Sequence, residues 1–316
     1  MNELIRKILA GHNVTDAEAL DAIDHKDEDE LFDGAHKITA MMAPREFDFC
    51  SIINAKSGAC PEDCKWCSQS AHYTGKAGIY EFVGAEKCLE HARFNEAHGV
   101  RRFSIVTSGR SPDPATFNEI VEAVRTIRAG SDIKICASLG LLGRQELQRL
   151  KEAGAERYHC NLEAAPSYFS AVCTTHTISD KVATLKAACD AGMEICSGGI
   201  IGMGETKEQR VELAFALREL GINSIPLNIL HPIKGTPLEN TPMLSEDEIL
   251  RTVAVFRLIH PTAYLRFAGG RANLSDDAVR KALYIGINAA ITGDLLTTAG
   301  ALIESDKRMV QGAGYL

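Results

Sequence analysis

The chain has 316 residues, 45% of them hydrophobic and 24% charged, as in an ordinary water-soluble globular protein. Its formal net charge of −8 argues against non-specific nucleic-acid binding, because that mode of binding needs a basic surface. No run of 18 consecutive apolar residues occurs, and the charged N-terminal segment lacks the apolar core of a signal peptide. These features predict a cytoplasmic protein that binds neither membranes nor nucleic acids.

The order of the expected elements predicts the fold. Residues 1–46 are interpreted as an N-terminal helical extension that packs outside the main domain. From residue 47 to residue 316, short β-rich apolar runs alternate with longer amphipathic segments such as Pro114–Ala129, Ser179–Ala191 and Ser245–Ile259. The expected strands are, in chain order, Phe49–Asn54, Arg102–Thr107, Ile133–Ser138, Arg157–Leu162, Met193–Ile200, Ser224–Leu230, Ala263–Ala268 and Ala289–Thr292. Eight such strand–helix units predict a (β/α)8 TIM-type barrel, in which ligands bind at the C-terminal ends of the strands.

Three of the ten cysteines, Cys60, Cys64 and Cys67, lie together in the loop after the first expected strand. A short loop of this kind directs three thiolates at one centre and leaves a fourth coordination position open. Structural zinc usually takes four protein ligands, commonly as two separated pairs, whereas iron–sulfur clusters are held by cysteine thiolates. The spacing favours a [4Fe–4S] cluster and leaves a zinc knuckle as the alternative.

The cysteine loop resembles the cluster motif of the radical S-adenosylmethionine (AdoMet) superfamily. Seven segments also resemble the biotin synthase family within it, and they cover most of residues 45–300. They are Cys60–Tyr73, Tyr158–Glu163, Cys196–Glu205, Ile225–Leu230, Lys234–Leu238, Tyr264–Arg271 and Leu295–Thr298. The resemblance implies an enzyme that cleaves AdoMet to methionine and a 5′-deoxyadenosyl radical and inserts sulfur into dethiobiotin to form biotin. It also implies a flavodoxin- or ferredoxin-type electron donor and a homodimer.

The resemblance assigns residues to three kinds of contact. Cys60, Cys64 and Cys67 would bind the [4Fe–4S] cluster. AdoMet would be contacted by Asn161, Glu163, Lys181, Gly199 and Ile201. Dethiobiotin would be contacted by His159, Asn161, Asn228, Thr297 and Thr298. Three of these positions differ from the family, which has Asp for Glu163, Arg for Lys181 and Asn for His159. The alternatives are a solvated Lys181, a buried structural His159, and a helix cap formed by the two threonines.

A second group of cysteines indicates an auxiliary cluster. The family holds a [2Fe–2S] cluster with cysteines on strands 2, 3 and 5 and an arginine on strand 7. Here Cys136, Cys196 and Arg266 keep three of these positions, but Ser104 stands at the strand 2 position. Cys50, on strand 1, is interpreted as the replacement ligand, because a thiolate binds iron better than a neutral hydroxyl group.

This pattern is similar to a branch of the family from strict anaerobes. The similarity implies an auxiliary cluster of the four-iron type, with Arg266 as a ligand, a hydrogen-bond donor or part of an ion pair. Cys160 alternates with His159 and Asn161, so we expect its side chain to point away from them. Cys88, Cys173 and Cys189 have no partners at a short spacing and are predicted to be structural.

Two other functions remain possible from the sequence. One is a different radical AdoMet enzyme on the same scaffold, such as a hydrogenase-cluster maturase or an amino-acid mutase. The other is a non-catalytic scaffold with zinc at the cysteine loop. Cys136 and Cys196, together with the YHCNLE and CSGG segments, favour the sulfur-inserting enzyme.

Overall fold

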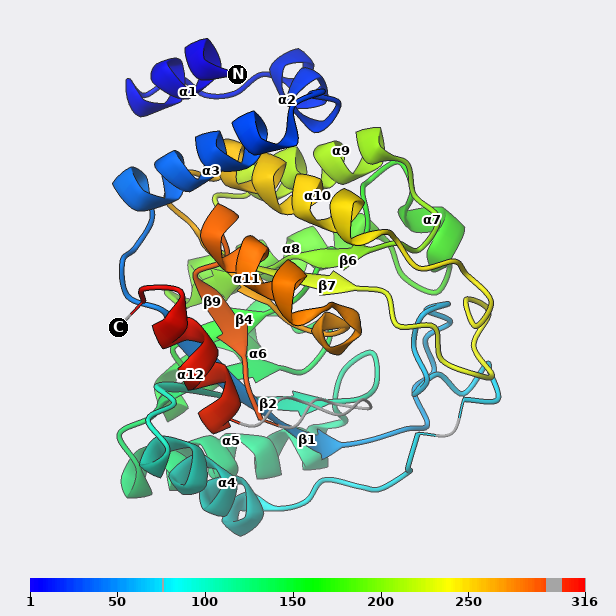
Figure 1. Cartoon of the computed structure of the whole chain (residues 1–316). Coiled ribbons are helices and arrows are strands. Elements are labelled where there is room, and N and C mark those ends of the chain that lie inside the picture. The colour runs from blue at the N-terminus through cyan, green and yellow to red at the C-terminus, as the bar shows by residue number, and fades with distance from the viewer. Residues whose placement is uncertain (76, 294–302, 316) are drawn as a thin grey trace.

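The computed structural model describes residues 1–75, 77–293 and 303–315, and Figure 1 shows strands at the centre of the molecule with helices around them. The elements are α1 (Asn2–Leu9), α2 (Asp16–Ile23), α3 (Glu28–Met42), β1 (Asp48–Lys56), α4 (Ala85–Ala97), β2 (Arg102–Thr107), α5 (Pro114–Gly130), β3 (Lys134–Ser138), α6 (Arg144–Ala153), β4 (Arg157–His159), α7 (Phe169–Val172), α8 (Ile178–Asp190), β5 (Glu194–Cys196), β6 (Gly199–Ile201), α9 (Lys207–Glu219), β7 (Ser224–Ile229), α10 (Glu246–Ile259), β8 (Tyr264–Phe267), α11 (Asp276–Ile285), β9 (Ala289–Ile291) and α12 (Ile303–Gly312). No helix within these described ranges is long and apolar enough to cross a membrane.

The strands form one curled parallel sheet with the order β5-β4-β3-β2-β1-β9-β8-β7-β6. Its two outer strands, β5 and β6, follow each other in the chain. A backbone hydrogen bond joins the two ends of the sheet: Ser197 N–H, just after β5, donates to Ser224 O of β7 at 3.2 Å. The predicted TIM-type fold is therefore confirmed.

The structure differs from the sequence-based expectation at the fifth strand. The single strand expected over Met193–Ile200 is divided into β5 and β6, with Ser197 and Gly198 between them. A Cβ atom on Gly198 would lie 1.9 Å from Pro226 O, so the backbone here passes against β7 at a distance that only glycine permits. The division thus results from a contact with a strand distant in sequence.

We expect the change Gly198→Ala to lower the free energy of unfolding by at least about 3 kcal/mol, because the backbone of β7 cannot yield to the added methyl group. Urea unfolding followed by circular dichroism measures this. Gly78→Ala is the control: a Cβ atom there meets nothing within 4 Å, and we expect a change of less than about 0.5 kcal/mol. Equal unfolding midpoints for the two variants would contradict the explanation.

The N-terminal helices cover one side of the barrel. In Figure 1, α1 to α3 lie at the top, and α3 packs on α10 and α11. His36 stacks on Tyr284 with ring centroids 3.9 Å apart, and Thr39 Oγ1 donates to Ile285 O at 2.8 Å.

The loops that follow β1 and β7 lie together on the right in Figure 1, beyond the C-terminal ends of those strands. The packed helices leave this end of the barrel to the functional loops.

Candidate active site

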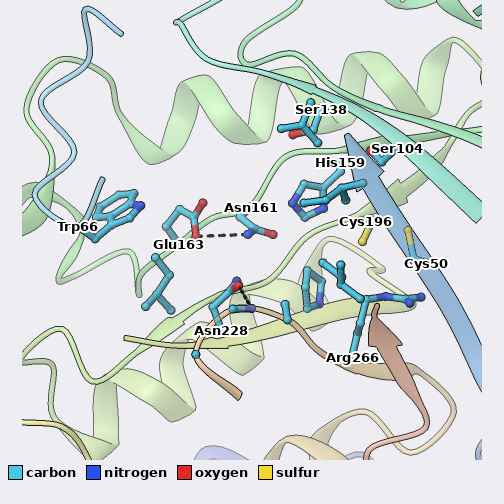
Figure 2. A pocket seen from close by; sticks show the side chains of 18 of the residues that line it. Cys50, Trp66, Ser104, Ser138, His159, Asn161, Glu163, Cys196, Asn228 and Arg266 are labelled. Carbon is cyan, nitrogen blue, oxygen red and sulfur yellow. Dashed lines mark hydrogen bonds between the residues drawn. The ribbon is translucent and has the colours of Figure 1, made fainter. Parts of the chain in front are cut away.

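A cavity of about 320 Å³ extends from the C-terminal ends of the strands into the barrel. Of the residues assigned from the sequence, those that line it are Cys50, Cys67, Cys136, His159, Asn161, Glu163, Cys196, Asn228 and Arg266. The described residues that line the cavity do not include Cys60, Cys64, Lys181, Gly199 or Ile201. Thr297 and Thr298 lie outside the described residues. Figure 2 shows Trp66, Glu163 and Asn161 toward one end of the cavity and the thiols of Cys50 and Cys196 toward the other.

The cysteine loop is fixed by its own backbone. Cys60 N–H donates to Gln69 O at 3.0 Å, and Cys67 N–H donates to Cys64 O at 3.0 Å. Gly58 and Ala59 have positive φ values of 74° and 49°, which make the tight turn after β1. Burial raises the pKa of Cys67 to about 11 and also raises that of Cys60, so these thiols need a bound cation to become thiolates at neutral pH. This donor set fits a cluster that supplies such positive charge.

Asn161 and Glu163 follow β4, on the side of the chain that faces the cavity. Asn161 Oδ1 accepts a hydrogen bond from Gly198 N at 3.0 Å, and its Nδ2 donates to Glu163 Oε2 at 3.3 Å (Figure 2). Glu163 has φ at 71°, a left-handed conformation that costs free energy in a non-glycine residue. Burial raises the pKa of Glu163, although the nearby charge of Lys181 opposes this. A strained, half-buried carboxylate beside an amide is typical of a ligand-binding position.

Lys181 is not the solvated lysine considered as the alternative. The residue is 8% exposed, and its Nζ lies 5.8 Å from the centroid of the Phe169 ring. The ammonium group therefore lies within the molecule beside Glu163, where its charge acts through little solvent.

His159 and Asn228 line the middle of the cavity. Burial lowers the pKa of His159 to about 4, so its imidazole is neutral at pH 7. Asn228 Oδ1 accepts from Gly269 N at 2.8 Å, and Asn228 Nδ2 donates to Gly199 O at 3.2 Å. A side-chain amide can make four hydrogen bonds. The oxygen and the nitrogen of the Asn228 amide can therefore each form a further hydrogen bond with a ligand.

The glycine-rich segment after β5 has a structural cause that the sequence did not reveal. A Cβ atom on Gly199 would lie 2.7 Å from Glu163 O, and the side chain of Ile201 is fully buried. The glycine at position 199 is thus already explained by the close contact of its backbone with Glu163.

Three thiols lie at the inner part of the cavity. Cys50 and Cys136 are hydrogen-bonded to each other, and Cys196 Sγ lies 3.3 Å from Ser224 Oγ. Burial disfavours the charged form of Cys136, but the hydrogen bond from Cys50 and the charge of Arg102 outweigh it and lower its pKa. Arg102 Nη1 lies 3.8 Å from Cys136 Sγ.

Three buried arginines surround these thiols. Arg266 donates to both the carboxylate and the backbone oxygen of Asp48, so it forms an ion pair at the floor of the cavity. Arg157 pairs with Glu194 at 2.7 Å. Ser104 Oγ and Arg102 Nε are buried without a hydrogen-bond partner. Thiols, guanidinium groups and unused donors together fit an anionic group that accepts hydrogen bonds, such as an iron–sulfur cluster.

The structure also shows the surroundings of two further buried cysteines, Cys160 and Cys173. Cys160 is buried in the hydrophobic core and does not line the cavity, in agreement with its expected direction. Cys173, interpreted as a structural thiol without a partner, lies 3.8 Å from Cys64, sulfur to sulfur. No local spacing pattern could reveal this contact, because the two residues are 109 positions apart.

A parallel barrel with a three-cysteine loop at its strand ends defines the class of radical AdoMet enzymes. The family model described as "Radical SAM superfamily" matches residues 55–217, and the model described as "Biotin and Thiamin Synthesis associated domain" matches residues 226–316. The chain is 51% identical over 315 residues to a biotin synthase of Parabacteroides distasonis, covering 100% of this chain and 96% of the relative. It is 53% identical over 309 residues to a biotin synthase of Porphyromonas gingivalis, covering 98% and 94%. The chain therefore belongs to the biotin synthase family.

Solved structures agree on the fold. The crystal structure of methylornithine synthase (PylB) matches with a TM-score of 0.82 and 18% identity, covering 98% of this chain and 95% of that one. The crystal structure of HydG, a maturase of the [FeFe]-hydrogenase, matches with a TM-score of 0.83 and 17% identity, covering 99% and 74%. At such identities only the fold is shared, whereas the family membership confirms the expected enzyme class and its use of a [4Fe–4S] cluster and AdoMet.

Proposed function

We propose that this enzyme inserts sulfur into dethiobiotin to form biotin, with dethiobiotin bound between the cysteine loop and the inner thiols. The observation that carries this is that Cys67 of the cysteine loop lines the same cavity as Cys50, Cys136 and Cys196. Figure 2 shows the carboxylate of Glu163 and the amides of Asn161 and Asn228 between Trp66 and the thiols of Cys50 and Cys196. When bound, the reduced cluster and AdoMet supply the radical that removes hydrogen from unactivated carbon. The side chains of this chain hold, orient and enclose the reacting molecules.

At the cysteine loop, Cys60, Cys64 and Cys67 would hold the [4Fe–4S] cluster and leave one iron to AdoMet. Trp66, in the same loop, lines the cavity and would limit the entry of water. Glu163 and Asn161 would position the polar groups of AdoMet. Lys181 would pair with the carboxylate of AdoMet as a point charge, because an ammonium group cannot form the two parallel hydrogen bonds that an arginine forms.

Asn228 is the proposed contact for the ureido ring of dethiobiotin. That ring carries two donors and one acceptor, and the amide retains one N–H and further acceptor capacity after its bonds to Gly199 and Gly269. His159, neutral at pH 7, would offer one donor or one acceptor nearby.

We expect Asn228→Ala to raise the KM for dethiobiotin about tenfold or more, because the ureido ring would lose a buried hydrogen-bond partner. Steady-state kinetics with varied dethiobiotin measures this, and iron content per chain serves as the control for intact clusters. An unchanged KM in a folded, fully loaded variant would remove Asn228 from the substrate site.

The inner thiols would hold an auxiliary cluster that donates the sulfur. Residue pairing places Ser104 level with Cys136, whereas Cys50 is paired with Arg102. Arg102 comes two residues before Ser104 on β2. Cys50 therefore lies one inward-facing layer nearer the N-terminal ends of the strands than the position of the family's strand 2 cysteine. We propose that this shift accompanies a larger, four-iron cluster, with Arg266 in the ion pair with Asp48 and close to the cluster.

Several further features belong to the same proposal and are supported by the family resemblance. These are the flavodoxin- or ferredoxin-type electron donor, the homodimer, the cytoplasmic location and the anaerobe-type branch. The roles of Gly199 and Ile201 near AdoMet, those of Thr297 and Thr298 near the substrate carboxylate, and the division into residues 1–46 and 47–316 are proposed on the same basis.

A further inference from the structure

A compact group of metal-binding atoms lies beside the cysteine loop. Cys64 Sγ, Cys173 Sγ and a ring nitrogen of His176 all lie within 4.8 Å of one another. Cys64 belongs to the loop after β1, and the other two residues follow α7. Both Cys173 and His176 are buried, and neither is needed in the sulfur-insertion reaction as assigned above.

The distances match a single tetrahedral ion. With Zn–S bonds of about 2.3 Å and Zn–N bonds of about 2.0 Å, tetrahedral angles put two sulfurs about 3.8 Å apart and a sulfur and a nitrogen about 3.5 Å apart. The two sulfurs are 3.8 Å apart here, and Cys173 Sγ lies 3.8 Å from His176 Nε2 and 3.3 Å from His176 Nδ1. All three donor atoms lie within 4.8 Å of one another, so a small rotation of the His176 ring would let them share one ion.

The neighbouring carboxylates hold these donors in place. The carboxylate of Glu62, which is 7% exposed, is hydrogen-bonded to His176 Nδ1. A metal-binding histidine usually donates its other ring N–H to such a carboxylate, which leaves Nε2 as the ligand. Asp63 Oδ1 accepts from Thr174 N at 2.8 Å and from Thr175 N at 3.1 Å, so the segment after α7 is fastened to the cysteine loop.

We propose that the cluster-free chain binds one divalent thiophilic cation, such as Zn²⁺ or Fe²⁺, at Cys64, Cys173 and His176. Both sulfurs would bind as thiolates, with any remaining thiol proton released to solvent, and Glu62 would orient the imidazole ring. The inference rests on the proposed function at one point: Cys64 is also assigned to the [4Fe–4S] cluster. The mononuclear ion and the complete cluster therefore exclude each other, and the ion must release Cys64 before the cluster is built.

The test is a titration of the reduced, cluster-free full chain with Co²⁺ under anaerobic conditions. We expect one Co²⁺ per chain with the visible spectrum of a tetrahedral thiolate site, in the wild type and also in the double variant Cys60→Ala/Cys67→Ala. Cys173→Ser and His176→Asn should each weaken binding at least about tenfold. Cys189→Ser and His12→Asn, both at exposed positions, are the matched controls and should bind as the wild type does.

Two results decide the proposal. Wild-type Co²⁺ affinity in both Cys173→Ser and His176→Asn would overturn it, and loss of binding in Cys60→Ala/Cys67→Ala alone would place the ion on the cysteine loop. If Cys173→Ser does not fold by circular dichroism, His176→Asn decides. Cleavage of AdoMet by reconstituted His176→Asn is measured separately, so a failure of the metal site is distinguishable from a failure of the proposed function.

Discussion

Replacing Cys60, Cys64 or Cys67 singly with alanine is expected to lower the rate of AdoMet cleavage by at least about a thousandfold. The cofactor carries the difficult chemical step, and two thiolates in this loop cannot hold a [4Fe–4S] cluster with one open iron. Each of the three thiols lies in a loop whose backbone is fixed by its own hydrogen bonds, so the loss is chemical rather than conformational. Formation of 5′-deoxyadenosine, measured after anaerobic reconstitution, reports the rate.

Cys189→Ala is the control for that experiment, because Cys189 is an exposed cysteine on α8 away from the cavity lining. Its iron content and its cleavage rate should equal those of the wild type. Wild-type formation of 5′-deoxyadenosine in any of the three loop variants would refute the assignment of that cysteine as a ligand.

The second large effect is expected from Cys50→Ser, which should lose the auxiliary iron and form at least about tenfold less biotin in a single turnover. Cys50 is buried, hydrogen-bonded to Cys136 and close to the ion pair of Arg266. A hydroxyl group at this position would stay protonated and would bind iron weakly. Iron and sulfide per chain, with the biotin formed, are the measurements.

Ser104→Ala is the matched comparison on the neighbouring strand. Its hydroxyl oxygen is buried without a hydrogen-bond partner, so alanine removes an unused polar group and should leave the auxiliary iron in place. Full iron content and normal biotin yield in Cys50→Ser would show that Cys50 is only a buried core thiol. Loss of auxiliary iron in Ser104→Ala instead would indicate that the ligand is Ser104, on β2.

Much of the site could be predicted from the alternation of side chains along strands. The pattern at His159, Cys160 and Asn161 predicted two residues toward the cavity and one toward the core, and the structure places them so. The division of the fifth strand was not predicted. Ser197, Gly198 and Gly199 interrupt the apolar pattern there, but the close approach of Pro226 O to Gly198 is a contact with a residue distant in sequence. The burial of Lys181 and the contact of Cys173 with Cys64 also depend on residues distant in sequence.

The backbone at Glu163 limits which amino acids evolution can place there. With φ at 71°, a β-branched side chain would clash with its own backbone, whereas aspartate, asparagine and glycine adopt this conformation most readily. A saturation library at this codon would therefore recover few functional variants, and aspartate should be among them because it also keeps the negative charge. The fold therefore tolerates an exchange between aspartate and glutamate at this position. It does not tolerate valine, isoleucine or threonine, because their side chains are β-branched.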